Sequence, residues 1–529
     1  MTSTAPAPSS PASPPPATDL RQRRRILVTV CIALMAVIAS VSGLNVAQPD
    51  LAVEFGASQS TILWMINLYT LSLAALLLPL GAVGDRFGRK RMLVAGLVLF
   101  GLASVAGGLA PSAEIMLAAR LLSGVGAAMI MPITLAVITS TFPAEERGRA
   151  IGIWTGVAGG GGILGMFLSA ALVDVANWRW LFVLPVVLVL VSLVMALRSV
   201  PDSREISRHP YDTTGAVASV VAVVGLIYFL QEGPERGWTE PLTLVTLAVG
   251  VLAAAFFVGW ELRRRDAALL DVRLFRERGL AGGSLTLLAV FGVQAGVFVV
   301  LFPFLQAVLG WSGLLSTAAL MPMAVLMMMT SGLAPKLAAR IGPKATMAAG
   351  VAMAGGGLAL MASVVSVDGG YLSVLPGMLA MGFGMGLSMT PSTEAITSSL
   401  PRERQGVASA LNDVTREFGT ALGVALLGAL LAAGYREAIT PHLAGVPENA
   451  AAPAREGVAN AVHATGAHAS ELARAARESF VEGWQQAMWA GVLVMGVLFV
   501  YVALRGPRRE SVSGAGQTAA QSAVLECDS

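Results

Sequence analysis

The sequence predicts an all-α protein that crosses a membrane fourteen times, and three observations carry this prediction. First, its 529 residues are 55% hydrophobic and only 13% charged, whereas about a quarter of the residues of a soluble domain are charged. Second, the chain repeatedly forms apolar runs of roughly 20 residues, the length that an α-helix needs to cross a bilayer. Third, the loops between these runs alternate between basic and nearly uncharged.

The predicted spans fall into a group of six, a pair, and a second group of six. Their approximate ranges are 26–48, 60–80, 91–110, 113–135, 149–173 and 178–198, then 213–231 and 240–261, then 280–304, 313–334, 345–366, 371–393, 406–433 and 485–505. Because the count is even, both termini are expected on the same side of the membrane.

The loop charges predict which side that is. The loops around residues 81–91, 145–149, 198–208, 263–278, 336–344 and 402–404 are all rich in Arg or Lys. The intervening short loops carry one basic residue, Arg236. Since basic loops stay in the cytoplasm, we expect both termini there. The near absence of lysine, with abundant Ala, Gly and Val, is typical of a GC-rich bacterial genome, so the expected location is a bacterial inner (cell) membrane.

These features predict five segments. They are a disordered cytoplasmic N-terminus (1–25), an N-terminal six-helix bundle (26–198), linkers with two inserted helices (199–278), a C-terminal six-helix bundle (279–505) that contains an outer loop (434–483), and a cytoplasmic tail (506–529). The outer loop is expected to hold a polar helix near residues 459–484.

Composition also excludes several kinds of site. A net charge of +3 is too small to indicate nucleic-acid binding, and two cysteines, Cys31 and Cys527, cannot form a thiolate metal centre. The four histidines lie outside the predicted spans, and the spacing of His463 and His468 favours solvated side chains over a metal site. We expect no metal and no cofactor.

Residues 81–91 (GAVGDRFGRKR) place one acid among four basic residues between two predicted spans. Such charge cannot lie in hydrocarbon, so a tight cytoplasmic loop is expected. Glycines allow close backbone approach and sharp turns. The residues of interest are Gly81, Asp85, Arg86, Gly88, Arg89 and Lys90.

The two halves of the chain are related by an internal repeat. Seven residues between Pro143 and Gly165, among them Gly148 and Gly161, recur 258 positions later between Pro401 and Gly423. Arg86, Gly88 and Lys90 recur similarly as Arg340, Gly342 and Lys344. Parallel six-helix repeats that enclose a midplane site are the architecture expected of a secondary transporter.

Several motifs resemble the fourteen-span drug:proton antiporter branch of the major facilitator superfamily, over residues 20–505. They are the G-x-h-x-D-R-x-G-R-K pattern at 81–90 (h, apolar), R-L-L-S-G-V-G-A-A at 120–128, W-R-W-L-F at 178–182, the 305–322 junction, and the 406–423 helix. The resemblance implies the superfamily fold and proton-driven export of lipophilic compounds. The implied partners are the lipid bilayer and a small lipophilic substrate, the energy source is the proton gradient, and the working unit is a monomer.

Two positions depart from the pattern of that branch. Many of its members have an Asp in the first helix where this chain has Ser40. Its fifth-helix motif usually contains Gly-Pro and a paired Gly, whereas this chain has Gly161-Gly162-Ile-Leu-Gly165-Met166. The first departure removes an acid, and the second softens a hinge that the resemblance associates with antiport.

Charged residues at mid-depth in a bilayer are functional candidates because their burial is costly. Asp413, Arg416 and Glu417 follow one another at helical spacing, and Gly419 and Gly423 form a G-x-x-x-G packing stripe beside them. We expect Asp413 or Glu417 to exchange the coupling proton and Arg416 to modulate it. The alternative is a permanent ion pair that only locks helices together.

Arg120, with Gly124 and Gly126 after it, is the other candidate within a span. By resemblance it is a proton-relay or substrate-side cation, and the alternative is an arginine satisfied by backbone carbonyls or a neighbouring acid. Asp85 is expected to accept hydrogen bonds from a facing helix N-terminus and so to latch the cytoplasmic side. The alternative is a solvated loop. The glycines of the fifth span, Gly156, the run 159–162 (which includes Gly161) and Gly165, are expected to pack closely at the interface between the halves. The alternative is small-residue packing without a hinge.

The leading function is therefore proton-driven export of a drug, antibiotic or secondary metabolite. An importer or uncoupled facilitator of a small metabolite is the alternative. A membrane-embedded sensor or enzyme is a third class, disfavoured because the sequence contains no HExxH motif, phosphate loop or Cys/His cluster.

Overall fold

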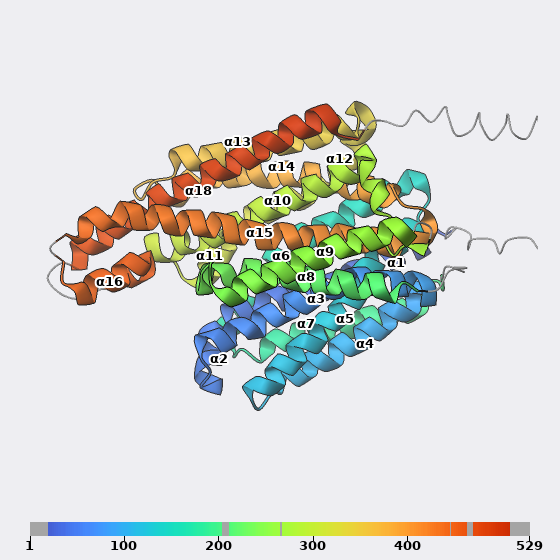
Figure 1. Ribbon diagram of the computed structural model, residues 1–529, viewed down its shortest axis with the longest axis horizontal. Helices are drawn as coiled ribbons and strands as arrows, with labels where there is room; N and C mark the ends of the chain where they lie inside the picture. The colour runs from blue at the N-terminus through green and yellow to red at the C-terminus, as the bar shows by residue number, and fades with distance from the viewer. Residues whose placement is uncertain (1–18, 204–210, 265–266, 445, 463–468, 508–529) are drawn as a thin grey trace, which may run out of the picture.

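A computed structural model describes residues 19–203, 211–264, 267–444, 446–462 and 469–507. Within these ranges the chain is helical with no β-strand, and fourteen helices are long and apolar enough to cross a membrane. The fourteen-span prediction is confirmed. Figure 1 shows the long helices running roughly side by side along the longest axis of the molecule.

The spanning helices keep the predicted order of six, two and six. They are α1 (Leu20–Val46), α3 (Gln59–Phe87), α4 (Arg89–Gly108), α5 (Ala113–Thr141), α6 (Ala144–Val175) and α7 (Trp180–Ser199); α8 (Thr213–Arg236) and α9 (Pro241–Arg264); and α10 (Arg278–Pro303), α12 (Met321–Ile341), α13 (Pro343–Val364), α14 (Gly370–Ser398), α15 (Gln405–Ile439) and α18 (Ala469–Arg505).

Short helices connect or extend them. These are α2 (Gln48–Phe55), η2 (Val272–Arg276), the π-helical turn η3 (Phe304–Val308), α11 (Gly313–Ala318), η4 (Arg402–Arg404), η5 (Thr440–Leu443), α16 (Glu448–Glu456) and α17 (Val458–Val462).

Local sequence explains where many helices begin. Asp19, Ser58, Ser112 and Ser312 each precede a helix, and each side chain accepts a hydrogen bond from a backbone N–H of the first turn. These side chains satisfy donors that have no partner within the helix. Residues 20–25, predicted to be disordered, therefore form the start of α1 after the Asp19 cap.

Each half packs into its own bundle. Helices α1 and α3–α7 contact one another, as do α10, α12–α15 and α18. Across the boundary, α6 packs against α12 and α14, and α15 packs against α3 and α5. The two boundary helices α6 and α15 carry the sequence repeat, so corresponding helices make corresponding contacts.

The inserted pair lies at the edge of the boundary. Helix α8 contacts α3 and α15, while α9 packs mainly on α8 and leaves most of its apolar surface exposed. The linker before α8 is tied to the first bundle by Tyr211, whose Oη donates to the Pro79 carbonyl at 3.1 Å. Burial raises the pKa of Tyr211 to about 12, so the hydroxyl keeps its proton at neutral pH.

We call the end of the molecule where α1 begins and α18 finishes the terminal face, and the opposite end, with α2 and α16, the far face (Figure 1). At the far face α15 and α18 extend beyond the other helices, and α16 packs against α15. Tyr435 Oη donates to the Ala454 carbonyl at 2.7 Å.

The polar helix predicted near residues 459–484 is present over residues 469–484, but it is not a separate element. Residues 469–484 are the first turns of α18, because the apolar span continues them without a break. His463 and His468 lie outside the described residues.

Candidate functional site

A cavity of about 780 Å³ lies between the two bundles. Helices α1, α3, α5 and α6 line one side, and α10 and α15 line the other, with α11 at one end. Gln48, Gln306 and Gly313, which lie towards the far face, also belong to its lining. The cavity is thus positioned where both halves of the repeat meet.

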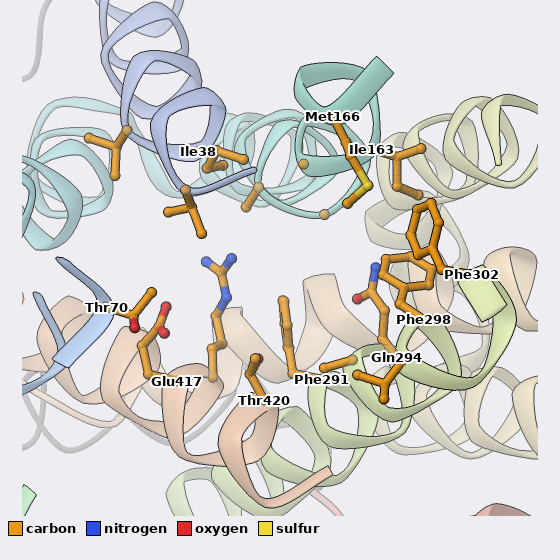
Figure 2. Close-up of a pocket in the computed structure, with 18 of the residues that line it drawn as sticks. Ile38, Thr70, Ile163, Met166, Phe291, Gln294, Phe298, Phe302, Glu417 and Thr420 are labelled. Atoms are coloured by element: carbon orange, nitrogen blue, oxygen red, sulfur yellow. The ribbon is translucent and has the colours of Figure 1, made fainter. Parts of the chain in front are cut away.

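Helix α10 turns one continuous face to the cavity. Phe291, Gln294, Ala295, Phe298 and Phe302 all line it, at the spacing of three and four residues that places side chains on one helix face. Figure 2 shows Ile163, Met166 and Ile38 across from this face. The sequence analysis did not identify these residues. The sequence signal that could have indicated this face is a single Gln at helical spacing from three Phe residues.

The charged residues of α15 do not all face the cavity. Arg416 and Glu417 line it, and Figure 2 shows Glu417 beside Thr70. Asp413 is fully buried and is absent from the lining. Its Oδ1 accepts hydrogen bonds from Asn412 Nδ2 at 3.1 Å and from Arg416 Nη1 at 3.4 Å. Of the two acids expected to exchange the coupling proton, only Glu417 lines the cavity.

Arg416 reaches between aromatic rings of both bundles. Its guanidinium carbon lies 4.4 Å from the ring centroid of Phe291 and 5.7 Å from that of Trp154 on α6. Both distances are within the range of cation–π attraction. Trp154 is held in place because its Nε1 donates to Thr134 Oγ1 at 3.0 Å. A charge on the second bundle is therefore stabilised partly by the first.

Asp85, at the terminal face, joins the two bundles as expected. Its carboxylate accepts hydrogen bonds from the backbone N–H of Gly406 at 2.7 Å and of Val407 at 3.2 Å, in the first turn of α15. Arg89 Nη2 donates to the same carboxylate at 2.7 Å and also to the Glu403 carbonyl at 3.3 Å. Asp85 and Arg89 are both buried. This cluster, which we call the Asp85 latch, joins α3 to α15 at the terminal face.

The glycines around the latch have separate roles. A Cβ on Gly81 would lie 2.6 Å from the Gly406 carbonyl oxygen, so α3 and α15 approach backbone to backbone there. Gly88 has φ +115°, which allows the sharp turn between α3 and α4. The tight loop predicted over 81–91 is thus reduced to Gly88, because α3 continues to Phe87 and α4 begins at Arg89.

Two other basic residues of this motif do not join Asp85. Lys90 Nζ donates to the Leu197 carbonyl on α7 at 3.0 Å, a contact within the first bundle. Among the described residues, Asp85 pairs with Arg89, Gly406 and Val407, and not with Arg86. Glu394 of α14 lies against the start of α6, with its Oε1 3.4 Å from where a Gly148 Cβ would be.

Arg120 is fully buried within the first bundle and does not line the cavity. Its Nε donates to the Met65 carbonyl at 3.0 Å, its Nη1 donates to Ser40 Oγ at 3.0 Å, and its guanidinium carbon lies 4.3 Å from the Tyr69 ring centroid. Ser40, the position at which the sequence departs from the family pattern, is therefore in contact with this guanidinium. Among the described residues no acid forms a salt bridge with Arg120, and its Nη2 has no hydrogen-bond partner.

The remaining glycines mark close helix contacts. A Cβ on Gly124 would overlap Ser72 of α3, and one on Gly126 would lie 2.8 Å from the Phe100 nitrogen of α4. Cβ atoms on Gly419 and Gly423 would overlap the carbonyl oxygens of Leu288 and Gly292 on α10. The G-x-x-x-G stripe therefore packs α15 against α10.

Gly161 and Gly165 pack against Met35 and Ala39 of α1, in their own bundle. Their expected position at the interface between the halves is wrong. Gly156 and Gly160 do lie at that interface as predicted, and Gly152 joins them, facing Met328 and Ser331 of α12. The helical period explains the difference, because a shift of one residue turns a side chain by about 100°. No group of three His, Cys, Asp or Glu residues suited to a metal ion occurs in the part of the chain that the structure describes.

Two similar helical bundles that enclose a cavity at their boundary define a membrane transporter of repeat architecture. The sequence matches the Major Facilitator Superfamily model over residues 30–424, and the chain belongs to this family. It is a transporter and not an enzyme.

Known proteins of this kind resemble most of the chain. It is 31% identical to the multidrug resistance protein Stp of Mycobacterium tuberculosis, with 90% of each chain covered. It is 31% identical to the multidrug efflux pump LfrA of Mycolicibacterium smegmatis, with 88% of this chain and 94% of LfrA covered. It is 32% identical to the cephamycin export protein CmcT of Amycolatopsis lactamdurans, with coverages of 76% and 83%.

Among solved structures, the proton:xylose symporter XylE has a TM-score of 0.57 at 14% identity, with 92% of this chain and 96% of XylE covered. A bacterial homologue of the human lysosomal transporter Spinster has a TM-score of 0.57 at 19% identity, with coverages of 92% and 97%. These similarities show the shared fold.

Proposed function

We propose that this protein exports a lipophilic small molecule, such as a drug, an antibiotic or a secondary metabolite, in exchange for protons. The observation that carries the proposal is the cavity between the bundles, which pairs an apolar aromatic wall with Glu417 and Arg416. The relatives named for multidrug or antibiotic efflux support export as the direction.

Glu417 is the group that we assign to proton exchange, because it lines the cavity and can meet water there. Asp413 is assigned to holding Arg416, since its buried carboxylate contacts that guanidinium. A rocking motion that moves Trp154 away from Arg416 changes the position of the guanidinium relative to Glu417. That position then decides whether Glu417 holds a proton, which links protonation to the motion of the bundles.

Alternating access is assigned to the two bundles (26–198 and 279–505), with the Asp85 latch opening and closing the terminal face. We place this face in the cytoplasm, because the Arg-rich loops lie there and basic loops remain inside. Both termini are then cytoplasmic, in the inner membrane of a bacterium. The protein is proposed to work as a monomer and to need the proton gradient but no cofactor.

Transport in proteoliposomes tests this proposal. A susceptibility panel on cells with and without the protein first identifies an exported compound. Purified full-length protein is then reconstituted with a pH dye in the lumen, and proton movement is recorded when that compound is added. Glu417→Gln is expected to lower compound-driven proton movement at least tenfold and to retain exchange of labelled for unlabelled compound. Glu437→Gln, at an exposed site on the same helix, is the matched control.

Full proton movement in Glu417→Gln would contradict the assigned role of this residue. If the wild type moves the compound down its own gradient without moving protons, the protein is an uncoupled facilitator and the proposed antiport is wrong.

A further inference from the structure

Gln294 is a polar residue on an otherwise apolar face of α10. Its side chain lines the cavity, as Figure 2 shows, and only 6% of the residue is exposed. Its Oε1 has no hydrogen-bond partner among the described residues. Burying an amide oxygen without a partner is unfavourable. A buried group of this kind that faces a binding cavity is suited to pair with a ligand.

Aromatic side chains lie directly beside this amide. Phe298 and Phe302 occupy the next turns of the same face, and Figure 2 shows Met166 and Ile163 on the opposite wall. Flat rings pack favourably between phenylalanine rings and a methionine thioether. Gln294 therefore lies at the edge of a slot that suits a planar ring.

The slot is separate from the charged groups of the cavity. Figure 2 shows Glu417 and Thr70 on one side and Gln294, Phe298 and Phe302 on the other. None of the four slot side chains that accompany Gln294 is charged. A neutral ring therefore fits this end, while Glu417 remains accessible to a proton at the other end.

We infer that the Gln294 end of the cavity binds a planar aromatic part of the substrate, and that Gln294 Oε1 accepts a hydrogen bond from an N–H or O–H on that ring. Gln294 is thus a specificity-determining residue for neutral aromatic compounds that carry a hydrogen-bond donor. A site of this design rejects an analogue without the donor, because the buried amide is then left unpaired. The inference rests on the proposed function only in taking this cavity as the substrate site.

Two fluorescent dyes of nearly equal shape test it. 7-Amino-4-methylcoumarin offers N–H donors, and 7-dimethylamino-4-methylcoumarin offers none. Their dissociation constants are measured with full-length protein in nanodiscs, with empty nanodiscs as the blank. The wild type is expected to favour the amino dye by about tenfold, the effect of one well-placed hydrogen bond. Gln294→Met, which keeps the length and removes the amide, is expected to reduce this ratio to about one.

Phe302→Leu is the matched control on the same helix face. It is expected to weaken both dyes severalfold and to keep the preference for the amino dye, because it removes ring packing but not the amide. Gln294→Leu provides a second amide-free variant if Gln294→Met is poorly folded. An unchanged ratio in either amide-free variant, equal binding of both dyes to the wild type, or no saturable binding of either dye overturns the inference.

This test is independent of proton coupling. Loss of the preference in Gln294→Met in a protein that moves no protons would uphold the inference and reject the proposed antiport. Proton-coupled export with an unchanged dye ratio in Gln294→Met would support the proposed antiport and reject the inference about Gln294.

Discussion

Buried arginines are stabilised in three different ways in this protein. Arg89 has a full ionic partner in Asp85, and Arg416 has a longer contact to Asp413 together with two aromatic rings. Arg120 depends on a carbonyl, a hydroxyl and the Tyr69 ring, and its Nη2 has no partner among the described residues. A buried cation without an acid is the least favourable of these arrangements.

A carboxylate at position 40 should therefore stabilise the fold. Ser40 Oγ already lies 3.0 Å from Arg120 Nη1, so Ser40→Asp places an acid within reach of the guanidinium. We expect the free energy of unfolding to rise by about 1.5–3 kcal/mol relative to Ser40→Asn, the range for hydrogen bonds to charged groups. Thermal unfolding of both variants in detergent measures this difference. An Asp variant no more stable than the Asn variant would show that the position cannot pair with Arg120.

At the scale of helices, glycine determines which pairs pack closely. Gly419 and Gly423 of α15 meet the backbone of α10, Gly81 of α3 meets Gly406 of α15, and Gly152 of α6 faces Ser331 of α12. Without a hydrophobic driving force between helices in lipid, such close contact is a main source of association. The first contact lies within a bundle, and the other two join the bundles.

Gly423→Ala should separate α10 from α15, because the added Cβ would overlap the carbonyl oxygen of Gly292, which belongs to a backbone that cannot rotate away. We expect a loss of about 1–3 kcal/mol in stability, typical of overpacking in a buried site. Gly428→Ala on the same helix is the control, since its Cβ would lie 3.6 Å from Val299 at ordinary contact distance. Thermal unfolding should distinguish the two variants clearly. Equal unfolding temperatures would mean that the contact between α10 and α15 accommodates the added Cβ without loss of stability.

At the scale of the whole molecule, the two bundles touch through few elements. Contacts of α15 with α3 and α5, and of α6 with α12 and α14, join them around the cavity. The Asp85 latch joins α3 and α15 at the terminal face, and the cavity lining includes residues near the far face. Under the proposed function, the latch separates the cavity from the terminal face.

Breaking the latch should expose the cavity from the terminal face. Ala158 lines the cavity, so Ala158→Cys in a Cys31→Ser, Cys527→Ser background reports access to a membrane-impermeant maleimide. Asp85→Asn removes the charge that Arg89 and the first turn of α15 share, and labelling from the terminal face should rise severalfold. Protease access to a C-terminal tag fixes the orientation of the protein in the vesicles.

Arg91→Gln, at an exposed site of the same motif, should leave the labelling rate unchanged. A rate in Asp85→Asn equal to that of the parent would mean that other contacts keep the terminal face closed.

Much of the architecture could be predicted from the sequence. The number and order of spans follow from apolar length alone, because a helix in lipid must satisfy its backbone hydrogen bonds within itself. The sequence also predicted that Asp85 contacts a facing helix N-terminus, because a carboxylate at a helix end can accept hydrogen bonds from free N–H groups. It predicted the packing of Gly419 and Gly423 as well, because glycines spaced four apart let two helices approach closely. The internal repeat indicated which helices correspond.

The tertiary structure alone decided which side of each helix meets the cavity. Hydropathy does not distinguish lipid from protein interior, so the Phe-rich face of α10 was not separable from a lipid-facing one. For the same reason the sequence did not show that Glu417 lines the cavity while Asp413 does not. It also did not show that Gly161 and Gly165 pack on α1. The sequence by itself determined that these helices cross the membrane, because crossing depends on the helix and the lipid. The cavity and its Gln294 amide depend on helix rotation, which only packing against neighbouring helices fixes.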